Sequence, residues 1–521
     1  MANNKKIIDS VHGNILVDSE YVTSIIDTPE FQRLRRIEQT SIRAIFPCAR
    51  HDRFIHSIGV YYLGSLFVKQ IEEDINNAIL ENLHITDAEY KQIRESYKIA
   101  CLVHDIGHAP FSHTLEELYG SKHEKLKQDI EAKIPHFSLT ERALNNAKHH
   151  ELASVYVAAS VEKIRSFIDS VGNIELVARM IIGFEYSDDT AYHQICNCFI
   201  SLLNGKVIDA DRLDYAFRDV WASGYCTSTI DVIRLISGLH ISNDDGKYKV
   251  CFDVNVLNEI TSVVNIKDFQ VRYVLNHHIV KYEQELLERG VKDAAIELST
   301  DVNEAQNKEN LYSQFINYKT ITEVIPYSNF KITRIADDDI IFLMKQCEHN
   351  HYFEEWSSRQ YKKFALWKTI DEFYAIFEDI PRDIAIDNTK IEESLRCLLK
   401  ERFGLDSEND ILILPVIFKA RVQLNSLMIR VKEHILPYEK LYRGALEKEQ
   451  EKIFMYVYIS KGEKTTEEID IFRKEIIESI RTLMTETYVF PDTKKWIKNM
   501  HPLKKKIKSH IFKIKSHIFL D

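Results

Sequence analysis

The chain has 521 residues, and its 68 basic and 79 acidic side chains give a formal net charge of −11. This length predicts two to four domains around a large core. The 15 glycines and 10 prolines make up about 5% of the chain, where roughly 12% is usual, and so few turn-formers argue against sandwiches, barrels and propellers. Because 45% of the residues are apolar, disorder is also excluded, and we expect a mainly α-helical globular protein.

The sequence lacks the signals of a membrane or secreted protein. No stretch approaches the roughly 18 uninterrupted apolar residues that a membrane span needs, and polar residues follow Ile7 and Ile8 too closely for a signal-peptide core. The eight cysteines are scattered, with Cys196 and Cys198 the closest pair, which suits neither a disulfide framework nor a four-cysteine zinc site. We therefore predict reduced thiols, no membrane span and a cytoplasmic protein.

The first part of the chain reads as a series of helices. Thr28 is a candidate N-cap, with Pro29 at the first helical position and Glu30 in the first turn. Further helices are predicted at about 56–76, 87–106, 113–132, 139–170, 174–183, 190–203, 210–219, 228–238, 254–289 and 296–307. A short strand is predicted over 249–253, after a turn at 243–246.

The pattern changes after about residue 335. Helices are predicted near 336–347, 364–377, 389–403 and 465–486, and strands over 411–418 and 454–459. We therefore expect a helical domain over 1–335, a smaller mixed α/β domain over 336–490, with a regulatory or oligomerising role, and a tail over 491–521.

The tail is basic and amphipathic. Residues 494–521 carry +8, which leaves −19 for the rest of the chain, and they include a perfect tandem heptad at 506–512 and 513–519. On a helix its isoleucines form an apolar stripe flanked by lysines. We predict that the tail docks on the acidic body or on a neighbouring subunit; a nucleic-acid contact and a membrane-surface helix are the alternatives.

One histidine–aspartate pair stands where a simple core would not place it. His104 and Asp105 lie at the end of an apolar helical pattern, just before Gly107. A buried imidazole next to a buried carboxylate needs partners, and one divalent metal ion would satisfy both. His108 has the i, i+4 spacing of a zinc pair with His104, but a helix that ends at Gly107 makes this spacing weak evidence.

A second group of polar residues shares one helical face. Asp211, Asp214, Tyr215 and Arg218 fall within an arc of about 100°. A solvated ladder of ion pairs is the alternative explanation for this face. Likewise, a lone histidine on a helix is usually an ordinary core or surface residue. A functional site is therefore indicated by the order of these motifs along the chain and not by any one of them.

Six motifs resemble one family in the same order. They are 9–13, 25–39, 46–47, 53–60, 104–113 and 211–219. Together they resemble the HD-domain metal-dependent phosphohydrolases, and among them the dNTP triphosphohydrolase branch that includes the SAM-and-HD-domain dNTPase. The resemblance covers roughly residues 7–290, so we expect a helical HD-domain core without a SAM domain.

The resemblance implies a metal centre. Its ligands would be His56, His104, Asp105 and Asp211. Imidazole nitrogens with carboxylate oxygens suit Mn, Mg, Fe or Zn, and the sequence does not choose among them.

The resemblance also implies catalytic residues. His108, His113 and His150 would line the pocket, with His150 as the general acid and Glu151 orienting it. Two alternatives for the general acid stay open, namely His149 and the pair at 123–124.

The implied substrate contacts cover sugar and phosphate. Gln39 would meet the sugar edge, Arg53 a phosphate, and Tyr215 and Asp219 the deoxyribose. Arg272, His277 and Lys281 are further candidates for the triphosphate, although the spacing of 272–281 departs from the family pattern.

These expectations lead to a dNTP triphosphohydrolase that releases a deoxynucleoside and intact triphosphate. The alternatives are a phosphohydrolase of another nucleotide or of single-stranded nucleic acid, and a non-catalytic nucleotide sensor. The family also implies a dimer or tetramer regulated by a nucleotide at Asp27, Gln32 and Arg35, unless this helix start serves only the fold. Antiviral depletion of dNTPs, known among relatives, is an analogy at the level of the fold.

Overall fold

The computed structural model describes residues 4–80, 85–119, 123–225, 230–244, 246–299, 312, 316–327, 330–377, 388–406, 409–418, 424–432, 434–441 and 452–489. The chain divides into two compact units, Met1–Gln360 with Ala420–Glu449, and Tyr361–Lys419 with Gln450–Asp521. Helices α16 and α17, at Asp337–Met344 and His351–Ser358, belong to the first unit. The boundaries at 335 and 490 stay sequence-based predictions.

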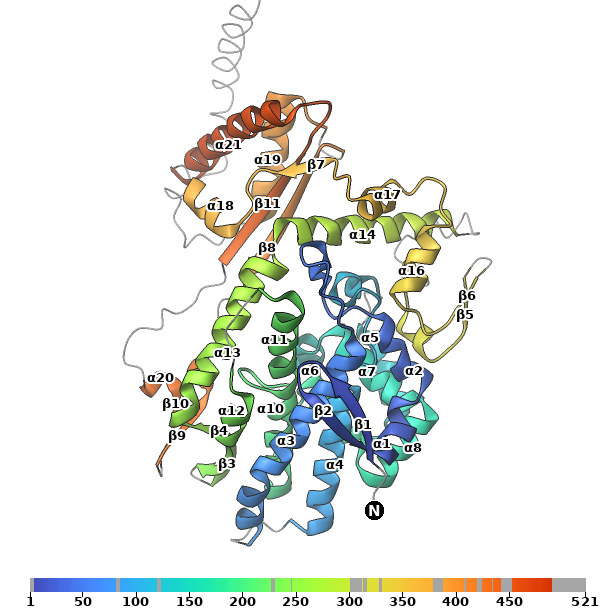
Figure 1. Cartoon of the computed structure of the whole chain (residues 1–521), viewed down its shortest axis with the longest axis vertical. Helices are drawn as coiled ribbons and strands as arrows, with labels where there is room; N and C mark the ends of the chain where they lie inside the picture. Colours follow the sequence, from blue (N-terminus) through green and yellow to red (C-terminus); the bar gives the residue numbers. More distant parts are fainter. Residues whose placement is uncertain are drawn as a thin grey trace, which may run out of the picture. The chain divides into compact units, whose positions relative to one another are not determined.

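The first unit is mainly helical, as predicted (Figure 1). Its helices are α1 Ser19–Tyr21, α2 Pro29–Gln32, α3 Arg53–Leu80, α4 Asp87–Val103, α5 His123–Lys133, α6 Glu141–Asn146, α7 His149–Ser160, α8 Glu162–Val171, α9 Ile174–Ile182, α10 Ala191–Leu203, α11 Ala210–Ser223, α12 Val232–Ser237, α13 Leu257–Phe269, α14 His278–Glu297, α16, α17 and α20 Tyr438–Leu441. Short helical turns connect them, including η2 Arg33–Arg36, η3 Ser41–Ala44, η4 Ser112–Thr114, η5 Glu116–Tyr119 and η7 Gln270–Leu275.

Small β-sheets complete this unit. Strands β1 (Asn4–Asp9) and β2 (Gly13–Asp18) pair as a hairpin, and so do β5 (Ile325–Tyr327) and β6 (Phe330–Ile332). Strands β3 (Leu239–Asp244) and β4 (Lys247–Asp253) join β9 (Met428–Val431) and β10 (His434–Pro437) in the order β10-β9-β4-β3. Pairing among these strands is antiparallel everywhere except between β4 and β9, which pair in parallel. The predicted strand is confirmed as β4. The predicted turn is confirmed as well, because Gly246 takes a left-handed φ of +82° between β3 and β4.

The second unit has the predicted mixed composition. Strands β7 (Lys363–Ala365), β11 (Lys452–Ser460) and β8 (Ile411–Phe418) form an antiparallel sheet in that order. Helices α18 (Ile370–Ile376), α19 (Asn388–Phe403) and α21 (Thr466–Val489) accompany it. Both predicted strands and the long final helix are confirmed.

Three of the long predicted helices are in fact interrupted. The predicted 139–170 helix is α6, α7 and α8, because Ala147 and Val161 adopt extended backbone between them. The 113–132 prediction covers η4, η5 and α5, and the 254–289 prediction breaks at η7 before an extended His277. Most of the predicted 296–307 helix, 300–307, lies outside the described residues, and α14 ends at Glu297.

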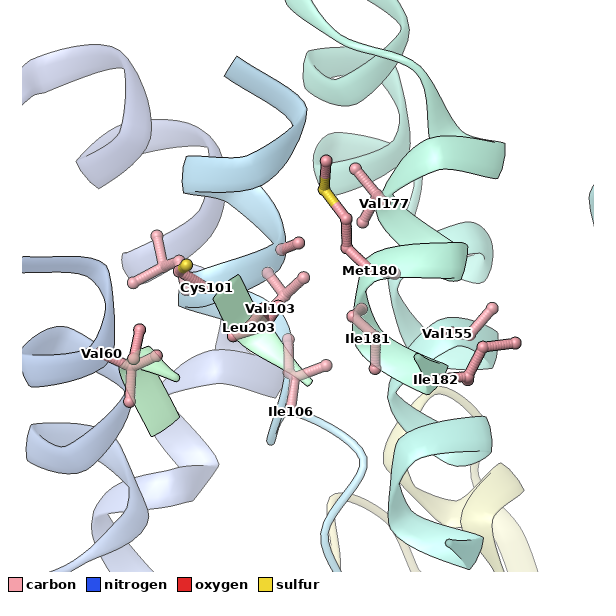
Figure 2. Packing of buried hydrophobic residues seen from close by; sticks show 14 of the residues in the cluster. Val60, Cys101, Val103, Ile106, Val155, Val177, Met180, Ile181, Ile182 and Leu203 are labelled. Carbon is pink, nitrogen blue, oxygen red and sulfur yellow. The ribbon is translucent and has the colours of Figure 1, made fainter. Parts of the chain in front are cut away.

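The apolar helix before the His-Asp pair is the centre of the core. In α4 and the turn after it, Ile99, Leu102, Val103 and Ile106 are all fully buried. Figure 2 shows Val103 and Ile106 with Val60 on one side and α9 on the other. α3 and α4 pack against each other, and α11 packs against α3. The ends of these helices therefore meet in a fixed arrangement.

Gly107 directs the chain as it leaves α4. A Cβ at this residue would overlap the backbone of α7 at Ala153 and Ser154. The absence of a side chain lets the turn pass directly against α7. The predicted basic tail, 491–521, lies outside the described residues. Within the described part of the chain, no helix is long and apolar enough to cross a membrane.

Candidate metal centre and catalytic cavity

Three helix ends bring the four predicted metal ligands together. His56 lies in the first turn of α3, His104 at the C-cap of α4 with Asp105 next to it, and Asp211 in the first turn of α11. Asp209 caps α11 by accepting a backbone N–H at 2.7 Å. The ligand atoms of His56, His104 and Asp211 all lie within 4.8 Å of one another.

This donor set fits a divalent metal ion. Nε2 of His56 lies 3.0 Å from Asp211 Oδ1 and 3.6 Å from Asp105 Oδ2, and Nε2 of His104 lies 3.7 Å from Asp211 Oδ1. Both nitrogens are buried without an aligned hydrogen-bond partner in the described part of the chain. Burial alone lowers the pKa of His56, but the carboxylates of Asp211 and Asp214 outweigh it and raise this pKa to about 9. The site is therefore built to hold positive charge, which a divalent ion supplies.

Asp214 orients the His56 ring. Its Oδ2 lies 2.7 Å from Nδ1 of His56, so that Nε2 faces the other ligands. Arg218 binds both oxygens of Asp214 at 2.8 Å, and His12 Nε2 lies 2.7 Å from Oδ1. Asp9 pairs with the same guanidinium at 2.8 and 3.0 Å. Because Asp214 and Arg218 are 0% and 2% exposed, the alternative of a solvated ion-pair ladder is wrong for this pair.

Gly59 is the glycine of the 53–60 motif, three residues after His56 on α3. A Cβ there would overlap the Asp214 carboxylate and the Arg218 guanidinium. The close approach of α3 and α11 at this point therefore requires glycine.

Arg53 binds Asp105, one of the predicted metal ligands. We expected it to bind a phosphate, and it lines the cavity described below. Its Nη1 binds Asp105 Oδ2 at 2.5 Å, its Nε binds Ser112 Oγ at 2.9 Å and its Nη2 binds the Gln39 carbonyl at 3.1 Å. Burial raises the pKa of Asp105, but the charge of Arg53 and the neighbouring histidines hold it below its usual range. The arginine therefore keeps this ligand ionised.

The three histidines predicted to line the pocket form a second cluster, but the fully buried His108 does not line the cavity described below. The rings of His108 and His150 stack at 4.2 Å, and His113 lies 5.2 Å from His150. Glu116 joins the cluster, because its Oε1 lies 2.6 Å from His150 Nδ1 and its Oε2 lies 2.7 Å from His113 Nδ1. Burial raises the pKa of Glu116, but His150 and His113 outweigh this and hold it far below its usual range.

The expected role of Glu151 is corrected by these contacts. Glu151 Oε2 accepts the N–H of Lys148 at 2.8 Å and so caps the start of α7, while Glu116 binds the ring of His150. A side chain adjacent in sequence on a helix points away from its neighbour, whereas η5 brings Glu116 back to α7. The spacing of Glu116, three residues after His113, was the available sequence signal. His150, and not His149, lines the cavity.

One cavity of about 370 Å³ connects the two clusters. Of the predicted residues it is lined by Gln39, Arg53, Asp105, His113, His150, Asp211, Tyr215, Asp219 and Lys281. Arg272 is not among the lining residues and lies 5.9 Å from the ring centroid of Tyr273. Of the three triphosphate candidates Arg272, His277 and Lys281, only Lys281 lines the cavity.

Several cavity residues escaped sequence reasoning. Lys148 and Lys267 line the cavity, and His51 Nε2 lies 2.7 Å from Asp219 Oδ1. Burial, with Arg212 nearby, lowers the pKa of Lys267 to about 8. Isolated lysines in helical patterns look like surface residues, so no local signal distinguished these two.

The three residues predicted to grip a regulatory nucleotide make contacts within the chain. Asp27 lies 3.5 Å from Lys5 Nζ, and Gln32 donates to the Ile26 carbonyl at 2.7 Å. Arg35 donates to Gln32 at 2.9 Å. These contacts agree with a role in the fold, and nucleotide binding there stays a prediction.

Fold and site together define a helical protein with a buried histidine–aspartate cluster that suits a divalent metal ion and borders a cavity lined by cations and carboxylates. Residues 53–215 match the model of the HD domain family, and this segment holds all four predicted ligands. The chain therefore contains an HD domain.

Curated relatives match about half of the chain. The deoxynucleoside triphosphate triphosphohydrolase SAMHD1 homolog of Dictyostelium discoideum is 30% identical over 288 residues, 53% of this chain and 45% of the relative. The SAMHD1 enzyme of Gallus gallus is 42% identical over 265 residues, 47% of this chain and 38% of the relative. An uncharacterized protein of Methanocaldococcus jannaschii is 27% identical over 308 residues, 59% of this chain and 53% of its own. The chain thus spans about half the length of these relatives.

Solved structures share the fold over most of the chain. A hypothetical protein from Aquifex aeolicus has a TM-score of 0.58 at 18% identity, covering 92% of this chain and 100% of its own. A phosphohydrolase from Bacteroides thetaiotaomicron has a TM-score of 0.56 at 20% identity, covering 88% of this chain and 100% of its own. At these identities the likeness concerns the fold alone.

Proposed function

We propose that this protein is a metal-dependent phosphohydrolase that converts a dNTP and water into a deoxynucleoside and intact triphosphate. One observation carries the proposal: a single cavity joins the metal ligands, the His150–Glu116 pair and a set of cations. The dNTP substrate is supported by similarity to deoxynucleoside triphosphate triphosphohydrolases at 30% and 42% identity.

The cavity offers separate contacts for phosphate and sugar. Lys148, Lys267 and Lys281 line it and would balance the charge of a triphosphate, which the acidic chain otherwise repels. Asp219 would accept the 3′-hydroxyl of the deoxyribose, and the Tyr215 ring would exclude a 2′-hydroxyl. A bound divalent ion would polarise the α-phosphate and lower the pKa of an attacking water.

His150 would protonate the departing 5′-oxygen. Glu116 binds its Nδ1, which leaves Nε2 to hold the proton, and a carboxylate partner stabilises the charged ring. The imidazole suits this role near neutral pH.

A direct product assay tests the proposal. The protein is incubated with each dNTP, NTP and dNMP in Mn²⁺ or Mg²⁺, and products are separated by anion-exchange chromatography. Triphosphate with a deoxynucleoside is expected. Release of dNMP with pyrophosphate would contradict the proposed bond cleavage, and no turnover of any nucleotide would favour a sensor.

We also propose nucleotide regulation coupled to oligomerisation, with Asp27, Gln32 and Arg35 as the binding residues. The family resemblance of the 25–39 motif supports this. Activity and light-scattering mass are measured with each added nucleotide; if neither changes, the regulatory proposal fails.

A further inference from the structure

The segment from His108 to His113 has an unusual backbone. Phe111 and Ser112 both take left-handed φ angles, +54° and +52°. For residues with a Cβ this conformation is unfavourable, and it persists only where surrounding contacts hold it. The contacts of this segment therefore determine where His113 lies in the cavity.

Asp337, the first residue of α16, makes one of these contacts. Its Oδ1 accepts the N–H of Phe111 at 2.6 Å, and its Oδ2 accepts the N–H of Glu38 at 2.9 Å. The side chain is not the helix cap, because Asp339 accepts the N–H of Ala336 at 2.8 Å. With 6% of its surface exposed, Asp337 is a buried bridge between two loops.

Both loops lead to the metal centre. Arg53 binds the residues that follow the two bridged backbone groups, Gln39 at 3.1 Å and Ser112 at 2.9 Å. The same guanidinium binds Asp105 at 2.5 Å. A shift of either loop would therefore move Arg53 and, with it, a metal ligand.

We propose that Asp337 is a positioning residue of the catalytic centre, whose carboxylate locks the 108–113 segment and, through Arg53, the orientation of Asp105. The kinetic test of this proposal rests on the proposed hydrolase function, whereas the hydrogen–deuterium exchange test does not.

The bridge needs the ionised carboxylate. Each oxygen accepts a backbone N–H. Protonation would place an O–H donor next to one of these N–H donors. The charged side chains around it are Arg33, Arg43, Asp338 and Glu38, the last paired with Arg43. Burial raises the pKa of Asp337 to about 8, since the Phe111 N–H and Arg33 offset only part of this effect. The bridge is therefore complete above this pH and weakens below it.

The kinetic test uses two amide variants of neighbouring residues. Asp337→Asn keeps the size of the side chain but turns an NH₂ donor toward a backbone N–H. We expect kcat to fall about 10- to 100-fold at high pH, as for small misplacements of reacting groups, with KM and metal content nearly unchanged. The difference should shrink as pH falls, because the protonated wild type resembles the variant. Asp338→Asn, whose side chain is 66% exposed, is the matched control and should behave as wild type.

The structural test is hydrogen–deuterium exchange of peptides covering 108–114. Asp337→Asn should speed exchange in this segment alone, and Asp338→Asn should not. Wild-type exchange and an unchanged pH profile in Asp337→Asn would overturn the proposal, and so would faster exchange throughout the protein with a lowered Tm. If the wild type hydrolyses no nucleotide, the proposed function fails, and the exchange data still decide the role of Asp337.

Discussion

Both predicted metal-binding histidines lie close to Asp211, whose Oδ1 is 3.0 Å from Nε2 of His56 and 3.7 Å from Nε2 of His104. Asp211→Asn removes the charge that a divalent ion needs while keeping the shape. We expect activity to fall by at least about 100-fold with a small change in Tm, and metal analysis to show reduced occupancy. Full occupancy in the double variant His104→Ala, Asp105→Ala would refute the ligand assignment.

Glu116 and Glu151 allow a matched comparison within one site. Glu116→Gln loses the charge beside His150 and should lower kcat about 100-fold, the scale of a general acid's contribution, without changing metal content. Glu151→Gln should keep both kcat and stability, because glutamine also serves the capping position at the start of α7. Equal losses in both variants would mean that the cluster is not organised by Glu116.

Lys267 gives the cavity a pH limit. Its pKa is lowered to about 8, chiefly by burial, so the amine is charged below this pH and loses its charge above it. KM for the triphosphate should therefore rise at alkaline pH, and Lys267→Arg should remove the rise because arginine stays protonated. A KM rise of the same size in Lys267→Arg would assign the effect to another group.

At the scale of elements, the approach of α3 to α11 depends on Gly59. Alanine normally stabilises a helix relative to glycine, but a Cβ here would overlap Asp214 and Arg218. Gly59→Ala should therefore destabilise the protein by roughly 1–3 kcal/mol, as overpacking does, and weaken metal binding through His56. Denaturant unfolding measures the first effect. Exposed Lys69 on the same helix is the control, since Lys69→Ala should change stability by less than about 0.5 kcal/mol.

At the scale of the whole molecule, the basic residues 494–521 need an oppositely charged partner. The tail carries +8 against −19 for the rest of the chain, and we predict that it docks on the protein itself. Deleting 494–521 should lower the stability of the oligomer, as measured by light scattering. The metal content should stay unchanged, because the deletion does not touch the predicted metal site. An unchanged mass and Tm, with loss of DNA or RNA retention alone, would replace docking by nucleic-acid binding. Both interactions weaken with salt.

Local sequence determined where most helices lie and the order of the predicted ligands, but not the interruptions at Ala147, Val161 and His277. The period of apolar residues placed Ile99, Leu102 and Val103 on a buried face, and Thr28 was identified as a cap from residue type alone, because both signals act within one or two turns. Only the tertiary structure decided which carboxylate serves which histidine. Glu116 reaches His150 across 34 positions of the chain, and Asp337 reaches Phe111 across 226. Lys267 and Lys281 come to the same cavity only because α13 and α14 fold beside the other lining elements. Such contacts depend on how separate elements pack, and the sequence around each partner carries no pattern that identifies the other partner.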